Sequence, residues 1–156
     1  MAMFIPGMRC VISGRPIHTA EEAVCFPPFI ANEADPLYVF SDAVIHADVF
    51  AAHPLAPRVQ ARLDEARRQT AVENRKCMIC GQPVSDPDDY VGLGHLVDDP
   101  NHALHRLNYA HFHRRHLSLW PNLDWLIAEL EALDHSGVWE KASLKRLVAS
   151  LRSGAS

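Results

Sequence analysis

The sequence contains no long run of apolar residues, because Pro, Asp or His interrupts each apolar stretch within a few positions. A membrane-spanning helix needs about 20 consecutive apolar residues, so we expect no membrane span. The chain also lacks an excess of positive charge, and its formal net charge is −4 at pH 7. A strongly basic domain is the usual electrostatic footprint of a nucleic-acid-binding protein. We therefore do not expect a membrane or a nucleic acid as the partner.

Cysteine is scarce as well, with four residues in a chain of 156. The first residues, MAMFIPGMRC, have no basic stretch followed by a long apolar run, so they do not predict a secretory signal. We expect a reducing, cytoplasmic environment. There, a Cys-x-x-Cys pair is more often a metal-binding or redox motif than part of a disulfide framework.

One stretch of the sequence matches another at a constant offset. Residues 10–54 align with residues 77–121 without a gap (77 − 10 = 67). The identical pairs include Cys10 and Cys77, Gly14 and Gly81, Pro16 and Pro83, His46 and His113, and Pro54 and Pro121. An internal repeat of this kind indicates a structural unit used twice. The sequence therefore predicts two modules, at residues 1–73 and 74–156.

The aligned modules differ at positions that suit a metal ligand. The second module has Cys77 and Cys80 in the segment CMIC, and His113 and His116 in the segment HRRH. Structural zinc is bound by four Cys or His side chains, often two from a tight turn and two from a helix. We therefore predict one structural Zn²⁺ site made of Cys77, Cys80, His113 and His116.

The first module has Cys10, Ser13, His46 and Val49 at the corresponding positions. Ser is a poor zinc ligand and Val is none. We interpret these four residues as a degenerate former metal site in a metal-free module. Cys25, His18 or His53 could still complete a second site with Cys10 and His46, and no spacing argument selects one of them.

Further histidines of the second module are alternative ligands: His95, His102, His105 and His111. The pair His102 and His105 has the same spacing as His113 and His116. The alignment favours His113, because His113 corresponds to His46 whereas His102 corresponds to Asp35. Replacement of a proposed ligand by one of the other histidines stays open.

Apolar and turn residues predict an α+β fold. Short strands are expected at residues 23–26, 37–40, 90–93 and 104–107. Helices are expected at residues 46–52 and 58–73, at the residues that carry His113 and His116, and at residues 122–136 and 144–151. The last two have apolar residues at helical spacing, which predicts that they pack into a core.

The order of a Cys-x-x-Cys-Gly turn, strands, and a His-x-x-His pair at the start of a helix resembles the treble-clef class of zinc fingers. That class includes LIM-type modules and, more distantly, HNH nucleases. The resemblance covers residues 77–116 and, in degenerate form, residues 10–50. It implies two tandem treble-clef-like modules with extra C-terminal helices. By analogy with LIM-type modules, it implies a non-catalytic adaptor that binds another protein and has no catalytic residues.

An HNH-type metal-dependent nuclease, or a nucleic-acid-binding protein, is the alternative within the same resemblance. His95, Asn108 and His113 supply an H…N…H order. HNH proteins usually carry Asp or His where Gly94 precedes His95, and zinc binding by His113 would occupy the third member. We therefore favour the non-catalytic adaptor, and enzyme activity stays open.

Overall fold

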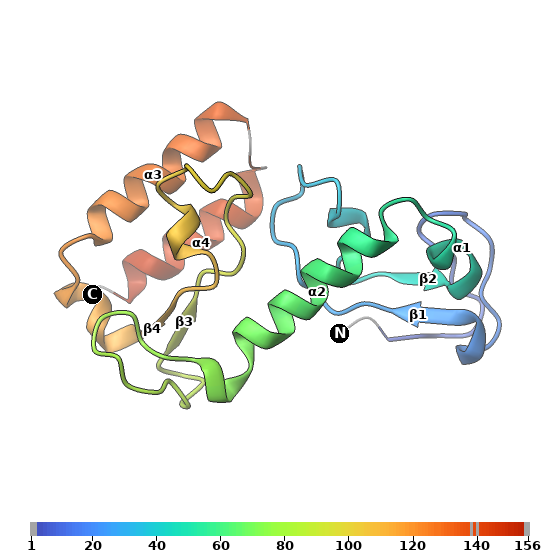
Figure 1. Cartoon of the computed structure of the whole chain (residues 1–156), viewed down its shortest axis with the longest axis horizontal. Coiled ribbons are helices and arrows are strands. Elements are labelled where there is room, and N and C mark those ends of the chain that lie inside the picture. Colours follow the sequence, from blue (N-terminus) through green and yellow to red (C-terminus); the bar gives the residue numbers. More distant parts are fainter. Residues whose placement is uncertain (1–2, 138, 140, 155–156) are drawn as a thin grey trace. The chain divides into compact units, whose positions relative to one another are not determined.

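The computed structural model describes residues 3–137, 139 and 141–154. This part of the chain forms two compact units, each with a two-stranded antiparallel sheet and helices (Figure 1). The first unit comprises the described residues up to Ile30 together with Asp35–Glu65. The second comprises Ala31–Ala34 and the described residues from Ala66 onward. The fold class is therefore α+β, as the sequence predicts.

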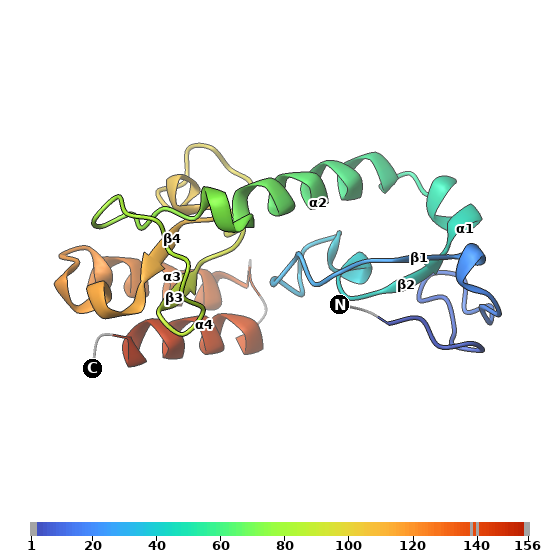
Figure 2. The same ribbon diagram turned by 90° about the horizontal axis from the view of Figure 1, so that it is seen from below.

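The sheet of the first unit pairs β1 (Ala23–Cys25) with β2 (Val44–His46), and Val24 lies opposite Ile45 (Figure 2). The helices of this unit are short, apart from α2, which also extends into the second unit. They are the 3₁₀ helices η1 (Ala20–Glu22) and η2 (Tyr38–Phe40), and the α-helices α1 (Ala47–Ala51) and α2 (Ala56–Thr70).

The core of the first unit combines the sheet with α2. Ile45 of β2 is fully buried, and α2 contributes the buried side chains of Val59 and Leu63. The rings of Phe26 and Phe40 meet edge to face, with 6.5 Å between their centroids. Aromatic and aliphatic burial therefore holds this sheet against α2.

The sheet of the second unit pairs β3 (Tyr90–Gly92) with β4 (His111–His113), and Val91 lies opposite Phe112. Its 3₁₀ helices are η3 (Val72–Asn74), η4 (His105–Leu107) and η5 (Arg114–Leu119). The α-helices α3 (Leu123–Ser136) and α4 (Lys141–Ser153) follow and pack side by side (Figures 1 and 2).

The apolar stripes of α3 and α4 form much of the second core, as the sequence predicts. Leu126 and Leu130 of α3 and Leu151 of α4 are fully buried in one cluster with Phe112 of β4. Helix α3 ends at Gly137, whose φ of 72° is the left-handed conformation that glycine adopts without strain. None of the described helices is long and apolar enough to cross a membrane.

The elements of the second unit follow those of the first at the offset of the sequence alignment. The starts of β3 and β4 are displaced equally from those of β1 and β2 (90 − 23 = 67 and 111 − 44 = 67), and both hairpins have the same register. Asp42 and Tyr109, which occupy aligned positions, both have a positive φ, of 53° and 58°. The aligned segments therefore have the same local backbone.

Two strand predictions are wrong. Residues 38–40 and 105–107 form the 3₁₀ helices η2 and η4, and the second strand of each hairpin comes later, as β2 and β4. A local hydrogen bond forms just before each of these 3₁₀ helices. In both, the N–H of the residue before the helix is accepted by a side chain two positions earlier in the sequence. Asp35 Oδ1 accepts from Leu37 (2.7 Å), and His102 Nδ1 accepts from Leu104 (3.1 Å). These local bonds favour a turn where apolar content favours a strand.

The helix expected to carry both His113 and His116 is also different. His113 is the last residue of β4, and His116 lies in η5, which is a 3₁₀ helix. In the first unit His46 likewise ends β2, and α1 begins at Ala47. The two histidines of the HRRH segment are therefore placed by a strand end and the helical turn that follows it. By contrast, the helices predicted at 58–73, 122–136 and 144–151 are present as α2, α3 and α4.

Candidate metal centre

The second unit brings two thiols and two imidazoles together. One ligand atom from each of Cys77, Cys80, His113 and His116 lies within 4.8 Å of the other three. We call these four residues the tetrad. Within the described ranges of the chain, no other His, Cys, Asp or Glu side chains form such a group.

A tight turn presents the two thiols. The N–H of Gly81 donates to the carbonyl oxygen of Cys77 (2.7 Å), and the N–H of Cys77 donates to the carbonyl oxygen of Gln82 (2.8 Å). Gly81 has a φ of 72°, which costs a residue with a Cβ about 1–2 kcal/mol. Glycine therefore lets the chain reverse immediately after Cys80.

Backbone hydrogen bonds fasten this turn to β4. The N–H of Met78 donates to the carbonyl oxygen of His111 (2.8 Å), and the N–H of His113 donates to Cys77 Sγ (3.4 Å). These two hydrogen bonds place the thiol of Cys77 beside the end of β4. Cys77 and His113 are buried, His116 is partly buried, and Cys80 is exposed.

Both imidazoles point Nδ1 toward sulfur. His113 Nδ1 lies 3.5 Å from Cys80 Sγ, and His116 Nδ1 lies 3.9 Å from Cys77 Sγ. His113 Nε2 donates to the carbonyl oxygen of Pro83 (3.2 Å), which leaves the lone pair of Nδ1 facing the thiols. A hydrogen bond from the far ring nitrogen is the usual way in which a metal-binding histidine is oriented.

The environment of Cys77 favours its thiolate. Burial raises the pKa of this thiol, but the backbone N–H groups of His113 and Cys80 outweigh that effect, with further help from the side chain of His116. Together they lower the pKa to about 6 from its ordinary value of 9.0. The thiolate is the form of cysteine that binds metals, so the fold prepares this ligand in advance.

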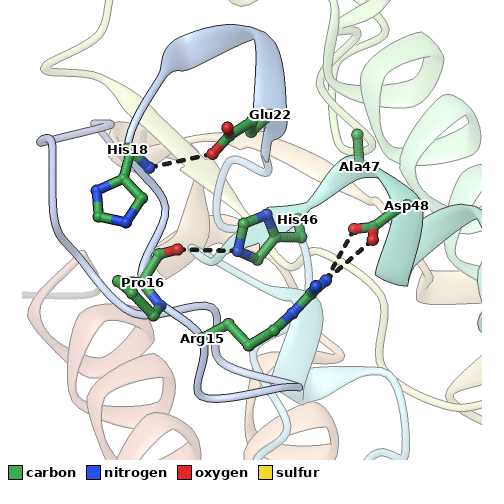
Figure 3. Close-up of a pocket in the computed structure, with 7 residues that line it drawn as sticks. All are labelled: Arg15, Pro16, His18, Glu22, His46, Ala47 and Asp48. Atoms are coloured by element: carbon green, nitrogen blue, oxygen red, sulfur yellow. Dashed lines mark hydrogen bonds and ion pairs between the residues drawn. The ribbon is translucent and has the colours of Figure 1, made fainter.

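In the first unit, Cys10 and His46 occupy the positions that correspond to Cys77 and His113, and they make similar hydrogen bonds with the backbone. The N–H of Ser13 donates to Cys10 Sγ (3.4 Å). His46 Nε2 donates to the carbonyl oxygen of Pro16 (3.1 Å), as His113 does to Pro83 (Figure 3). Burial raises the pKa of the Cys10 thiol, and hydrogen bonds from Ser13 and the His46 backbone lower it by more. The fourth position is Val49 in α1, which has no lone pair to offer.

A hollow beside His46 is also lined by Arg15, His18, Glu22 and Asp48 (Figure 3). Its charged side chains have partners within the protein. The guanidinium of Arg15 donates to both carboxylate oxygens of Asp48 (3.1 and 2.9 Å), and Glu22 Oε2 accepts the backbone N–H of His18 (3.2 Å). Cys25, one possible additional ligand, is exposed in β1 and belongs to no metal-ligand group of the described chain.

The alternative histidines of the second unit lie outside the tetrad. His111 Nε2 donates to the carbonyl oxygen of Gln69 (2.9 Å), and its Nδ1 accepts from the hydroxyl of Tyr90 (3.1 Å). Burial lowers the pKa of His111, which favours this neutral form. His102 Nδ1 accepts a backbone N–H and His105 lies in η4. The structure therefore groups the four residues that the alignment favours.

Two residues of the H…N…H order have structural partners. His95 Nε2 lies 3.1 Å from Asp98 Oδ1. Asn108 Oδ1 accepts the N–H groups of Leu96 and Val97 (2.7 and 3.1 Å), and its Nδ2 donates to the carbonyl oxygen of Val97 (2.8 Å). Asn108 therefore braces a loop.

Ser41, at the position aligned with Asn108, makes the same three bonds in the first unit. Its hydroxyl accepts the N–H groups of Phe29 and Ile30 (3.0 and 3.1 Å) and donates to the carbonyl oxygen of Ile30 (3.1 Å). Sequence reasoning missed this pair of bracing residues. The signal that could have found them was a polar residue at the same position of both modules.

No family model matches the chain, and comparison with curated proteins and with solved structures gives no significant match. Function is therefore inferred from the site itself. Two thiols and two imidazoles within 4.8 Å form a group that could hold one metal ion. An ion bound by all four side chains would keep no open coordination position.

Proposed function

We propose that this chain is a non-catalytic, zinc-stabilised adaptor that binds another protein in the cytoplasm. The tetrad is the observation that carries the proposal, because its four ligand atoms lie within 4.8 Å of one another. Cys₂His₂ is a donor set typical of structural zinc, and soft thiolates disfavour magnesium and calcium. A reducing compartment would keep both thiols available to the metal.

Zinc at the tetrad would connect three pieces of the second unit: the Cys77–Cys80 turn, the end of β4 and η5. The hairpin itself has only three residues in each strand. A module of this size has a thin hydrophobic core, and a metal commonly supplies the missing stability. Structural zinc sites contribute roughly 10–16 kcal/mol of apparent folding free energy at neutral pH.

We infer further that residues 1–73 and 74–156 are two copies of one treble-clef-like module, of which the first is metal-free. Equal spacing of strands, equal register and the matched bracing residues Ser41 and Asn108 support this inference. Loss of a thiol at Ser13 and of an imidazole at Val49 accounts for the absence of zinc from the first copy.

The non-catalytic interpretation is supported by how the candidate catalytic residues are used. In the nuclease alternative, His95, Asn108 and His113 would supply a general base and the ligands of a divalent cation. His113 belongs instead to the tetrad, and Asn108 holds the backbone of Leu96 and Val97. Among the described residues, the tetrad is the one group of three or more His, Cys, Asp or Glu side chains whose ligand atoms lie within 4.8 Å of one another.

Exposed apolar side chains near the tetrad support a protein partner. Met78, between the two cysteines, is 47% exposed, and Leu119, at the end of η5, is 71% exposed. Exposed apolar side chains of this size can be buried by a protein partner, and these two lie within three residues of a tetrad ligand in the sequence. We therefore assign Met78 and Leu119 to the partner-binding surface.

The experiment is quantitative crosslinking in cells of the source organism, with the wild-type chain compared with Met78→Asp/Leu119→Asp. The matched control is Val72→Asp, since Val72 is 54% exposed in η3. We expect specific crosslinks to disappear in the double variant and to persist in the control, with zinc content unchanged in both. Equal crosslinking by all three proteins, or DNA cleavage by the wild type with Mg²⁺ or Mn²⁺, would contradict the proposal.

A further inference from the structure

The two thiols of the tetrad differ in their exposure to solvent. Cys80 is exposed, whereas Cys77 is buried, and their Sγ atoms lie within 4.8 Å of each other. Cysteines that react with peroxides are accessible to solvent and often have a second cysteine nearby, which converts the oxidised sulfur into a disulfide. The Cys77–Cys80 turn therefore combines a thiol that an oxidant can reach with a neighbouring thiol that can react next.

The backbone keeps this pair together. The N–H of His113 donates to Cys77 Sγ (3.4 Å), and the N–H of Gly81 donates to the carbonyl oxygen of Cys77 (2.7 Å), which closes the turn. Because only two residues separate the cysteines, they stay close to each other even when the other ligands move away.

The other two cysteines lack this arrangement. Cys10 is buried, and Ser13 occupies the position aligned with Cys80. Cys25 is exposed in β1 and lies in no Cys-x-x-Cys segment. The first unit therefore supplies one buried and one exposed thiol as internal controls for oxidation of the second unit.

We propose that Cys80 is a site of oxidation by hydrogen peroxide, and that Cys77 then forms a disulfide with it, with loss of zinc from the tetrad. The inference rests on the proposed zinc site and adds its regulation. The second unit would be folded under reducing conditions and would lose its metal when peroxide accumulates.

The reaction takes two steps. The Cys80 sulfur attacks one oxygen of the peroxide, the O–O bond breaks, and the products are a sulfenic acid and hydroxide. The Cys77 thiolate then attacks the Cys80 sulfur, the S–S bond forms, and the S–O bond breaks to release a second hydroxide. Overall, two thiolates, one hydrogen peroxide and two protons give one disulfide and two water molecules.

The disulfide changes the second unit because thiolates are the form of cysteine that binds metals. Only His113 and His116 would be left of the four ligands, and a structural zinc site needs four. The hairpin of β3 and β4 and the helix η5 should then lose their order, as they should after chelation. A dithiol reductant restores both thiols, so the change should be reversible when zinc is present.

The test is a titration of the full zinc-loaded chain with hydrogen peroxide. A zinc-sensitive dye follows the release of zinc, and mass spectrometry of proteolytic peptides maps the disulfides. We expect one zinc released for each Cys77–Cys80 disulfide, together with loss of the NMR signals of the hairpin, and recovery of both after addition of dithiothreitol and zinc. Zinc that stays bound after Cys25 is oxidised would overturn the proposal. Release that accompanies sulfonic acids, or a disulfide that involves Cys10 or Cys25, would also overturn it.

Two variants separate the disulfide from general oxidation. Cys80→His keeps a side chain that binds zinc but cannot form the disulfide, so its zinc should resist peroxide. Cys25→Ser removes the exposed thiol of the first unit and should release zinc as the wild type does. Loss of peroxide sensitivity in Cys25→Ser would contradict the assigned role of Cys80. The peptide map of the wild type decides the matter if Cys80→His does not fold.

Measurement of zinc before oxidation distinguishes this inference from the proposed function. A chain purified under reducing conditions without zinc would contradict the proposed function, and this inference with it. A loaded chain whose zinc resists peroxide would contradict this inference alone.

Discussion

Cys10 and Cys77 have nearly the same backbone surroundings, but only Cys77 belongs to a metal-ligand group of the described chain. Each thiol is buried and accepts a backbone N–H, that of Ser13 in the first unit and that of His113 in the second. In each unit the histidine that ends the second strand donates Nε2 to the carbonyl oxygen of a proline. The turn and hairpin therefore form without a complete set of metal ligands.

The cores of the two units also differ at aligned positions. The first unit has Phe26, Phe40 and Phe50 in mutual contact, with centroid separations of 4.9–6.5 Å. The second unit has leucines at the aligned positions, namely Leu93, Leu107 and Leu117. Aromatic side chains bury more area and add edge-to-face contacts. We infer that aromatic packing stabilises the first unit where zinc stabilises the second.

The largest expected difference between the units is their response to a chelator. Removal of zinc should unfold the hairpin and η5 of the second unit, because roughly 10–16 kcal/mol of apparent folding free energy is lost. The first unit should keep its structure. NMR spectra before and after treatment with a strong chelator measure both effects, and re-addition of zinc should restore the lost signals. Melting of both units together would show that they do not differ in this way.

Substitution of single ligands should give the second-largest difference between the two units. Cys80→Ser and His113→Ala should each lose bound zinc and destabilise the second unit by several kcal/mol, since a structural site needs all four ligands. The matched variants Ser13→Ala and His46→Ala should leave the zinc content unchanged. Zinc analysis and denaturant unfolding give the two readouts. A Cys80→Ser protein that folds normally with a full equivalent of zinc would refute the tetrad.

Restoration of the missing ligands should make the first unit resemble the second. Ser13→Cys with Val49→His gives the first unit four ligands at the positions of the tetrad. We expect a second equivalent of zinc, held more weakly because α1 is an α-helix whereas η5 is a 3₁₀ helix. Native mass spectrometry counts the ions, with each single substitution as control. A double variant that binds no further zinc would mean that the two backbones differ more than their register indicates.

The smallest expected effect concerns the aromatic core. Phe40→Leu introduces the residue found at Leu107 and should destabilise the first unit by about 1–2 kcal/mol, because Phe40 is fully buried. Phe29→Leu, at a partly buried ring, should cost less. Unfolding followed by resonances of the first unit measures both. If Phe40→Leu left the stability of the first unit unchanged, aromatic packing could not be what replaces zinc there.

The tetrad could be predicted from sequence because metal ligation tolerates very few side chains, the alignment chose His113 among the nearby histidines, and His116 has helical spacing from His113. Helices α2, α3 and α4 were predictable for a related reason, since long apolar stripes leave little ambiguity. The short elements were not. Residues 37–40 have the composition of a strand, yet a single bond from the Leu37 N–H to Asp35 starts a 3₁₀ helix.

Other features of the site depend on contacts between distant residues. The loop braces at Ser41 and Asn108 bind backbone groups 11 and 12 positions earlier, which spacing alone does not reveal. Similarly, His113 lies at a strand end because β4 pairs with β3. The sequence pattern had instead predicted the partner strand of β3 at residues 104–107. The ligands were therefore easier to predict than the elements that carry them.

Elemental analysis of the purified full chain, combined with native mass spectrometry, decides whether one structural zinc is bound in the second unit and none in the first. We expect one tightly held zinc per chain, which only a strong chelator removes. A metal-free folded protein, two zinc ions per chain, or a loosely bound ion that exchanges with magnesium or manganese would contradict it.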